Sequence, residues 1–270
     1  DAILSRGLGD VYKRQVKFVL NFEVQAKELS EIEDKYDAIF LGLGTYESIK
    51  GDYKGFEKDG VVEALPYLTE NTKYLMNEND ALSMDFKNQK VVVLGGGDTA
   101  MDCVRTALRQ GAKKVTCVYR RDFENMPGSR KEVKHAMEEG VEFLFNHQIV
   151  EAKGDDKLSE LIAEETELFG NDGSGRKKPK VKEGTQKKIE LDKLVIAFGY
   201  QASPQEFFTN KKINVDDWGL IQLNNDKFKY QTSNEKYFAG GDMIIGSSLA
   251  VYAIAHGRDA AKEIIKYLNS

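Results

Sequence analysis

The stretch Lys90-VVVLGGGDTAMDCVRTALRQGAKKVTCVYRR-Asp122 decides the fold of this chain. Val91 to Leu94 is a β-branched run of the kind found in buried strands. The residues after the three glycines carry apolar side chains at helical spacing, and a second strand-like run extends from Val115 to Tyr119. The order of strand, glycine turn, helix and strand predicts the first part of a βαβαβ half-fold.

The glycine turn reads G-x-G-x-x-A, and its spacing suits a dinucleotide. Gly95 permits a tight turn, Gly97 leaves room for a pyrophosphate against the backbone, and Ala100 lets the helix pack close to the strand. Asp98 and Thr99 can cap the helix, whose free N–H groups and dipole attract phosphate. Glycine-rich turns also occur for packing alone, so the position between a strand and a helix carries the inference.

The residues after the second strand indicate which dinucleotide is bound. An NAD site commonly carries an acid about 20 residues after the glycines, where it binds the ribose 2′-hydroxyl. Arg120 and Arg121 stand there instead. The planar guanidinium group matches phosphate oxygens, so the pair favours NADP(H) over NAD. A solvated arginine pair at a strand end is the alternative.

The bulk composition limits the classes of function. The chain has 270 residues, enough for one large or two ordinary domains, and its net charge of −5 disfavours general nucleic-acid binding. No apolar run approaches the roughly 18 residues that span a membrane. Cys103 and Cys117 form neither a disulfide framework nor a metal-binding spacing. We expect a cytoplasmic protein with no nucleic-acid or membrane partner and no metal ligands.

Residues 1–15 are expected to be foreign to the protein. Asp10-VYKR-Gln15 looks like the translation of a transposon adapter used in DNA sequencing libraries, and the residues before it show no helix or strand pattern. We therefore exclude this segment from the fold. A genuine flexible terminus is the alternative.

The segment between residues 16 and 87 carries further structure signals. The pattern predicts a strand over 16–24, a charged surface connection over 26–35, a buried strand over 36–46, a helix over 59–77 with an early interruption at Pro66, and a polar linker up to 87. Gly42 and Gly44 end the buried strand, where backbone can approach a ligand.

The segment after Arg121 completes the half-fold. We expect a helix over 130–139, capped by Ser129 with Glu132 in capping-box spacing, and a strand over 141–145. Segments 158–168 and 187–191 flank GNDGSGRKKPK, which predicts a hairpin tip. The basic run within that tip is expected to be a solvated turn rather than a binding patch.

The C-terminal part alternates strands and helices less regularly. We expect an apolar strand over 194–199 that ends in glycine, and an irregular, polar stretch over 200–236. A short strand then closes on Gly240-Gly241-Asp242, and a long amphipathic helix extends over 247–268.

These pieces together resemble a known family. Glycine-ended strands, a G-x-G-x-x-A unit between two of them and a Gly-Gly-Asp before a helix resemble flavin–pyridine-nucleotide oxidoreductases. More narrowly, the segments 95–121, 125–133, 138–143, 238–242 and 257–261 are similar to the small (β) subunit of glutamate synthase. The NADPH-and-FAD portion of dihydropyrimidine dehydrogenase and flavoprotein subunits of ferredoxin–NADP transhydrogenases share the pattern.

The resemblance implies an α/β fold with two Rossmann-like dinucleotide-binding domains. The NADP domain, at 88–198, would be inserted in a partial FAD domain made of 16–87 and 199–270. The family begins with cysteine clusters for [4Fe–4S] centres and a first G-x-G-x-x-G for FAD, and neither occurs in this sequence. We therefore expect an N-terminally truncated chain, with [4Fe–4S] clusters only in the missing region.

The resemblance also implies positions for the cofactors. The NADP pyrophosphate would lie over Gly95, Gly97, Asp98, Thr99 and Ala100, its 2′-phosphate at Arg120 and Arg121, and its nicotinamide half near Ala197, Phe198 and Gly199. FAD would contact Gly42, Leu43, Gly44, Gly241, Asp242, Ser248 and Leu249. No side chain is expected to act as a catalytic acid or base, because hydride transfer is the chemistry of the cofactors.

The implied function is electron input to glutamate synthase. Electrons would pass from NADPH to FAD, then to iron–sulfur centres and to the large subunit, where 2-oxoglutarate and glutamine-derived ammonia become glutamate. Two alternatives stay open. One is an NADPH/FAD module that serves another acceptor, such as ferredoxin or a pyrimidine-reducing partner; the other is a non-enzymatic NADP-binding subunit. The missing C-x-x-C argues against disulfide chemistry.

Overall fold

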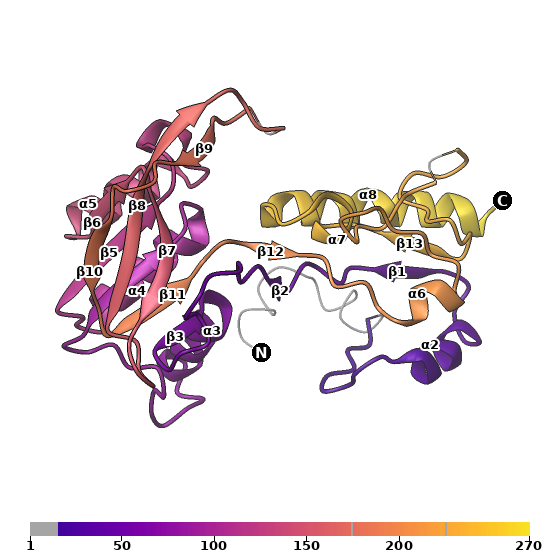
Figure 1. Cartoon of the computed structure of the whole chain (residues 1–270). Coiled ribbons are helices and arrows are strands. Elements are labelled where there is room, and N and C mark those ends of the chain that lie inside the picture. The colour runs from indigo at the N-terminus through magenta and orange to yellow at the C-terminus, as the bar shows by residue number, and fades with distance from the viewer. Residues whose placement is uncertain (1–15, 174, 225) are drawn as a thin grey trace. The chain divides into compact units, whose positions relative to one another are not determined.

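The computed structural model describes residues 16–173, 175–224 and 226–270, which divide into two compact units (Figure 1). Unit 1 contains residues 16–43 and 204–270, and unit 2 contains residues 44–203. The expected foreign segment, 1–15, lies outside the described residues.

Unit 2 is built on a parallel sheet of five strands. Their order is β3 (Val61–Glu63), β11 (Lys193–Ile196), β4 (Lys90–Leu94), β5 (Lys114–Tyr119) and β6 (Glu142–Phe145). The expected strand–helix–strand order around the glycine turn is confirmed. Strand β4 lies in the middle of the sheet, so the turn that follows it is flanked by the carboxyl ends of β5 and β11.

Three helices cover one face of this sheet. They are α3 (Ala64–Leu75), α4 (Asp98–Arg109) and α5 (Arg130–Glu138). Because successive strand residues point to opposite faces, Val91 and Val93 of β4 join the helices in one core cluster. Tyr67 of α3 stacks on Phe86 in that cluster, with ring centroids 4.4 Å apart.

An antiparallel sheet covers the other face. It contains β7 (His147–Lys153), β8 (Glu160–Phe169), β9 (Lys178–Val181) and β10 (Lys187–Glu190). Val92 and Leu94 of β4 pack with Ile149, Leu161 and Ala163 of this sheet. The expected antiparallel pairing of β8 with β10 is confirmed, but the expected tip at 170–180 was too long, because residues 178–181 form β9 and pair with β8. Strand β7 was not expected.

Unit 1 has a smaller framework. Strands β1 (Ile39–Leu41) and β13 (Tyr237–Ala239) form a parallel pair, and the helices are α2 (Ala26–Glu33), α6 (Phe207–Asn210), α7 (Asp242–Ile245) and α8 (Ala250–Leu268). Tyr237 donates its hydroxyl to Glu33 of α2, and Lys211 forms an ion pair with the same carboxylate. Although burial opposes it, these contacts hold the pKa of Glu33 below its usual value.

Several sequence-based expectations were wrong in this region. Residues 16–24 form no strand, because no other strand of the described chain pairs with them. Residues 26–33 form α2 rather than a charged connection, and Gln25 and Glu28 form a capping box at its start. Pro66 does not interrupt α3, because it lies in the first helical turn, where its missing N–H has no partner to lose.

Unit 2 covers residues 44–203 and is therefore longer than the domain expected from the sequence at 88–198. Residues 44–87 belong to unit 2 because β3 pairs with β11 and because α3 packs against α4. Unit 2 also contains a short antiparallel pair, β2 (Glu47–Ser48) with β12 (Tyr200–Gln201), near both of its ends. Which cofactor each unit binds stays a prediction.

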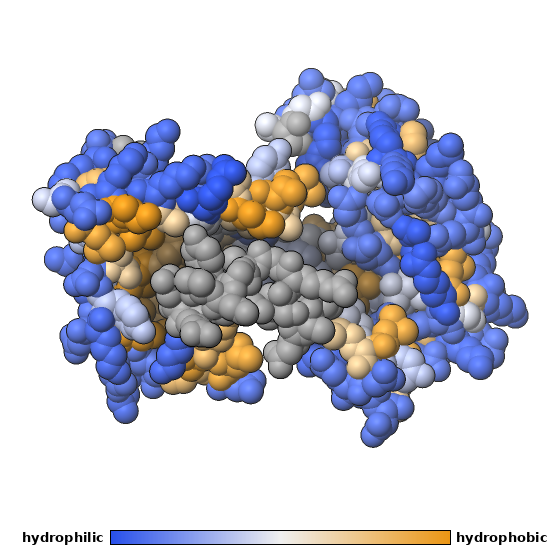
Figure 2. Space-filling model, turned by 180° about the vertical axis from the view of Figure 1, so that it is seen from behind, coloured by the Kyte–Doolittle hydropathy of each residue, from blue (hydrophilic) through white to orange (hydrophobic). Residues whose placement is uncertain are grey.

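Apolar side chains reach the surface of unit 1, and Figure 2 shows apolar patches among the hydrophilic residues. The apolar side chains of unit 1 that are more than half exposed include Phe18, Leu20, Leu249, Val251 and Ile254. Within α8 only Ala260 is buried. The core of unit 1 is therefore small beside that of unit 2.

Replacing a core leucine of unit 2 should destabilise it far more than replacing an exposed one. Leu194 on β11 is fully buried, so Leu194→Ala should lower the free energy of unfolding by about 2–5 kcal/mol. Leu75 is 70% exposed, and Leu75→Ala should change the free energy by less than about 0.5 kcal/mol. Urea denaturation followed by far-UV circular dichroism tests both, and equal losses would contradict the layered core.

Candidate dinucleotide site

Gly95 makes the turn after β4 possible. Its φ of 145° is a conformation that side chains disfavour, and a Cβ there would lie 2.2 Å from the carbonyl oxygen of Ala197. The Gly95 N–H also donates to the carbonyl of Val118, 3.2 Å away. The turn therefore touches the strands on both sides of β4.

Gly96 and Gly97 are required for different reasons. A Cβ on Gly96 would meet the Tyr119 ring at 2.5 Å, so this glycine makes room for a tyrosine. Gly97 is the N-cap of α4, and a Cβ there would meet no atom within 4 Å. That open space faces the first turn of a twelve-residue helix, where unpaired N–H groups and the helix dipole favour anions. The residues present therefore fit a pyrophosphate.

Ala100 is fully buried, as expected for close packing of α4 on the sheet. Its N–H donates to the Gly97 carbonyl at 3.0 Å. Thr99 is half-buried in the first turn of the helix.

A loop at residues 126–129 holds the glycine turn from outside. The Gly128 N–H donates to the Gly96 carbonyl at 2.9 Å, and a Cβ on Gly128 would lie 3.0 Å from that oxygen. The Asp98 carboxylate accepts from the Ser129 N–H at 2.7 Å. The expected capping box of Ser129 and Glu132 is wrong, because the Ser129 side chain makes no capping bond. Asp98 binds this helix start instead.

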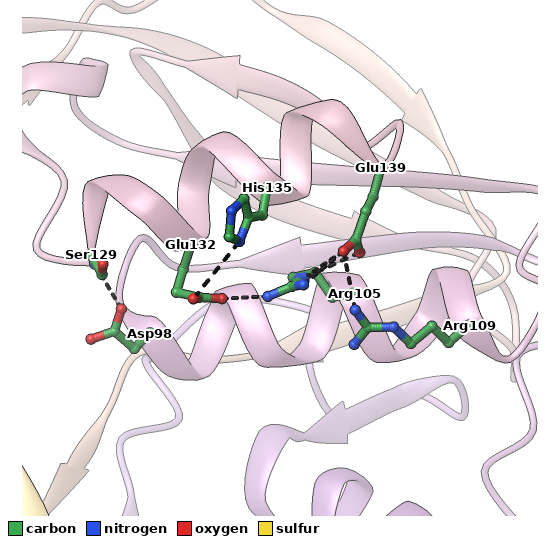
Figure 3. A network of polar contacts seen from close by, with 7 residues as sticks. All are labelled: Asp98, Arg105, Arg109, Ser129, Glu132, His135 and Glu139. Carbon is green, nitrogen blue, oxygen red and sulfur yellow. Dashed lines mark hydrogen bonds and ion pairs between the residues drawn. The ribbon is translucent and has the colours of Figure 1, made fainter.

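Glu132 takes part in an ionic network between α4 and α5 (Figure 3). Arg105 of α4 pairs with Glu132 and makes a two-pronged contact with Glu139, with Nε and Nη2 at 3.0 and 2.7 Å from Oε1. Arg109 adds a contact of 3.1 Å to Glu139. The Arg105 hydrogen bond lowers the pKa of Glu139. The network fixes α5, and with it the loop on the glycine turn.

The two arginines after β5 have different surroundings. Arg120 is exposed, and its guanidinium forms no ion pair within the described part of the chain. Arg121 is only 5% exposed and pairs with Asp172, Nη2 to Oδ2, at 2.8 Å. The Arg121 guanidinium is therefore already bonded to protein groups, whereas that of Arg120 is not, and the expected contact of both arginines with the 2′-phosphate stays a prediction.

The end of β11 lies next to the glycine turn. Ala197 donates its N–H to the Leu94 carbonyl at 2.8 Å, Phe198 is half-buried, and Gly199 has a φ of 99° with open space at its Cβ position. Tyr200 follows, and its buried hydroxyl has no partner among the described residues. Burial raises the pKa of Tyr200 to about 12.

The residues expected at FAD are distributed over both units. Gly42 and Leu43 follow β1 in unit 1, whereas Gly44 begins unit 2 with a φ of 69°. Ser248 and Leu249 are exposed immediately before α8. The position of these groups as one site stays a prediction.

Asp242 follows the tight turn after β13. It is half-exposed at the start of α7, and no side-chain partner of its carboxylate occurs among the described residues, as suits a hydroxyl-binding group. The Gly241 N–H donates to Nδ1 of His256 at 3.1 Å, which fixes the backbone before Asp242. A Cβ on Gly240 would lie 2.9 Å from the Phe40 ring.

Sequence reasoning missed the residues that support the turns. Tyr119, Asn125, Asp172 and His256 act through contacts with segments distant in sequence, which no local pattern reveals. The glycine of the Met-Pro-Gly-Ser loop was a usable signal for Gly128, because an isolated glycine often marks a close approach of backbone.

Two kinds of feature are absent from the described residues, a metal-binding cluster and a membrane-spanning helix. No group of three or more His, Cys, Asp or Glu residues in them could hold a metal ion. Nor does this part of the chain contain a helix of the length and apolarity needed to cross a membrane.

Comparison with known proteins identifies the family. The family model described as pyridine nucleotide-disulphide oxidoreductase matches residues 9–257. The chain belongs to this family. FprA from Mycobacterium tuberculosis, in a structure titled as a complex with NADPH, superposes with a TM-score of 0.72 at 19% identity, covering 91% of this chain and 66% of FprA. The expected α/β fold is confirmed.

Two relatives of higher sequence identity show which members of the family this chain resembles. The glutamate synthase [NADPH] small chain of Escherichia coli is 46% identical over 94% of this chain and 55% of its own length. The putative oxidoreductase AegA of Escherichia coli is 44% identical over 94% of this chain and 40% of its own. The resemblance to glutamate synthase small subunits is confirmed, and the chain spans about half the length of these curated relatives.

The contribution of Glu139 to stability should depend on pH. Because its pKa is lowered in the folded chain, its stabilising effect is complete above the unfolded value of about 4.3 and is lost as the pH falls through the folded value. Thermal denaturation of the chain and of Glu139→Gln, between about pH 7 and about pH 3, measures this. The Tm difference should be largest near neutrality and vanish in acid. A difference that persists at the lowest pH would contradict an ionic role.

Proposed function

We propose that this chain is the NADPH-oxidising part of a flavoprotein oxidoreductase of the glutamate synthase small-subunit type. The observation that carries the proposal is the open space at Gly97, at the start of α4 and beside the end of β5. A pyrophosphate in that space would contact the α4 N–H groups, and Arg120 stands one residue beyond β5. The identity to glutamate synthase [NADPH] small chains supports NADPH as the donor.

Residues of unit 1 would hold FAD in this proposal. Asp242 would bind a ribityl hydroxyl, and the start of α8 at Ser248 and Leu249 would direct its dipole toward the flavin. When bound, FAD would supply the hydride-accepting and one-electron chemistry that no side chain of this chain provides. This chain's residues therefore bind and orient the two cofactors. His256 would keep Asp242 in place through the Gly241 N–H.

The proposed acceptor is the large subunit of glutamate synthase, reached through iron–sulfur centres, in the cytoplasm. The names of the similar small chains support this assignment. A second candidate is the same module serving a different acceptor. It is favoured by the nearly equal identity to AegA, whose name assigns no acceptor.

One experiment tests the activity. The chain, extended at its N-terminus by the first FAD-binding segment and the iron–sulfur region that the family carries, is incubated with FAD, freed of excess flavin by gel filtration, and assayed for NADPH oxidation with ferricyanide as the acceptor. Retained flavin with NADPH-dependent reduction supports an oxidoreductase, and Asp242→Ala should then reduce flavin retention. Adding purified large subunit with glutamine and 2-oxoglutarate separates the two acceptor candidates, because only the glutamate synthase assignment yields glutamate. NADP⁺ binding without any flavin retention or turnover would support the non-enzymatic alternative.

Gly97 should be needed for binding but not for folding. Its φ of −91° suits any residue, and its Cβ position is open, so Gly97→Ala should leave the Tm unchanged. The added methyl group would occupy phosphate space and weaken NADP⁺ binding on the order of tenfold, about 1.4 kcal/mol. Gly95→Ala is the matched control and should lower the Tm, because its Cβ would meet the Ala197 carbonyl. Unaltered NADP⁺ affinity in Gly97→Ala would place the pyrophosphate elsewhere.

Arg120 should distinguish NADP⁺ from NAD⁺. Removing a charge-assisted hydrogen bond to the 2′-phosphate should weaken NADP⁺ binding by about tenfold or more, with little change for NAD⁺. Titration calorimetry of Arg120→Ala with both nucleotides measures the ratio. Equal losses for the two nucleotides would contradict the 2′-phosphate assignment.

A further inference from the structure

The Arg121 guanidinium binds the β8–β9 hairpin. Its Nη2 pairs with Asp172 at 2.8 Å, and its Nε donates to the Lys177 carbonyl at 2.6 Å. Only 5% of the Arg121 side chain is exposed. Withdrawing it toward a ligand would leave the Asp172 carboxylate without this partner in a partly buried place, which is unfavourable.

Asp172 organises the tip of the same hairpin. Its Oδ1 accepts from the Arg176 N–H at 3.0 Å, and its own N–H donates to the Arg176 carbonyl at 2.6 Å. The loop closed by these bonds leads directly to Lys177. Arg121 therefore contacts both the residue that shapes the tip and the backbone that leaves it.

The tip is also tied to the glycine turn. The Lys177 N–H donates to Oδ1 of Asn125 at 2.9 Å, and the Asn125 carbonyl accepts from the Tyr119 hydroxyl at 2.8 Å. The Tyr119 ring lies against Gly96. Both backbone polar groups of Lys177 are thus fixed to the segment 121–125, which follows β5.

We propose that Arg121 is a positioning residue, and that Lys177 of the hairpin supplies the second cation for the 2′-phosphate, next to Arg120. The inference rests on the proposed NADPH function and names the residues that select the phosphate. The Lys177 side chain is exposed, and its amine forms no ion pair within the described part of the chain. The basic run, expected from the sequence to be a solvated turn, then takes part in cofactor selection.

Arg120 is fixed through its backbone, whereas Arg121 is fixed through its guanidinium. The Arg120 carbonyl accepts from the Thr166 hydroxyl of β8 at 2.8 Å, so its backbone is fixed without using its guanidinium. A free guanidinium can make two parallel bonds to phosphate oxygens, whereas a lysine acts as a single charge. Arg120 should therefore contribute more selectivity than Lys177.

Calorimetric titration of variants of the full chain with NADP⁺ and NAD⁺ tests the proposal. Lys177→Met should reduce the NADP⁺ preference several-fold, and Lys180→Met, which removes a charge from β9 of the same hairpin, should not. Asp172→Asn should lower the preference as Lys177→Met does, and in combination the two losses should not add, because both act through Lys177. Arg121→Gln should match Asp172→Asn, and its hairpin amides should exchange hydrogen faster.

Other results would overturn the proposal. If Arg121→Gln loses the NADP⁺ preference while Asp172→Asn and Lys177→Met keep it, Arg121 binds the phosphate directly. If all three keep it, the hairpin has no part in selection. Arg120→Met shows whether the proposed NADPH function itself is wrong. An unchanged NADP⁺ preference in that variant would mean that no 2′-phosphate is bound beside β5, whatever the hairpin variants show. Thermal denaturation identifies any unfolded variant, and Asp172→Asn, which keeps the shape of the side chain, replaces Arg121→Gln if the latter does not fold.

Discussion

The close approach of Gly95 to the Ala197 carbonyl is the constraint on which the rest of unit 2 depends. At this point the chain leaves β4 between two neighbouring strands, and no side chain fits. The turn can therefore start α4 directly above the sheet edge, with its N–H groups pointing out of the layers. Wider spacing would move the helix start away from the carboxyl ends of β5 and β11, where ligands bind in open α/β sheets.

Supporting contacts surround this turn from three directions. The loop at Gly128 holds it from the side of α5, the Tyr119 ring fills the space beside Gly96, and the hairpin reaches the same tyrosine through Asn125. The ionic network of Arg105 lies behind the first of these contacts. Binding groups on short turns gain their fixed geometry from such second contacts, because the turn alone would move.

The sequence predicted the central unit well because its signals are local. Val91 to Leu94, the glycines and the helix that follows carry their own spacing, and the structure has them at nearly the expected bounds. The sequence could not predict that Arg121 would be buried, since its partner Asp172 is distant along the chain. At residues 16–24 the sequence predicted a strand that does not form, because an apolar run becomes a strand only where another strand pairs with it. Ser129 likewise had the right spacing for a capping box at the start of α5, yet its side chain makes no capping bond. The Asp98 carboxylate accepts from the Ser129 N–H instead.

The short β2–β12 pair bears on the order in which the chain folds. Unit 1 is discontinuous, and its central pairing joins Leu41 to Ala239, so β1 is synthesised long before its partner strand. Closing so long a loop is entropically unfavourable, by about 0.6 kcal/mol for each doubling of its length. Once unit 2 has folded, Ser48 and Tyr200 lie side by side, and the effective loop shrinks from roughly 195 residues to about 40, namely residues 42–46 and 202–236. Unit 2 therefore brings together the two segments of unit 1 that precede and follow it in the sequence. Folding of unit 2 before unit 1 would let these two segments pair quickly.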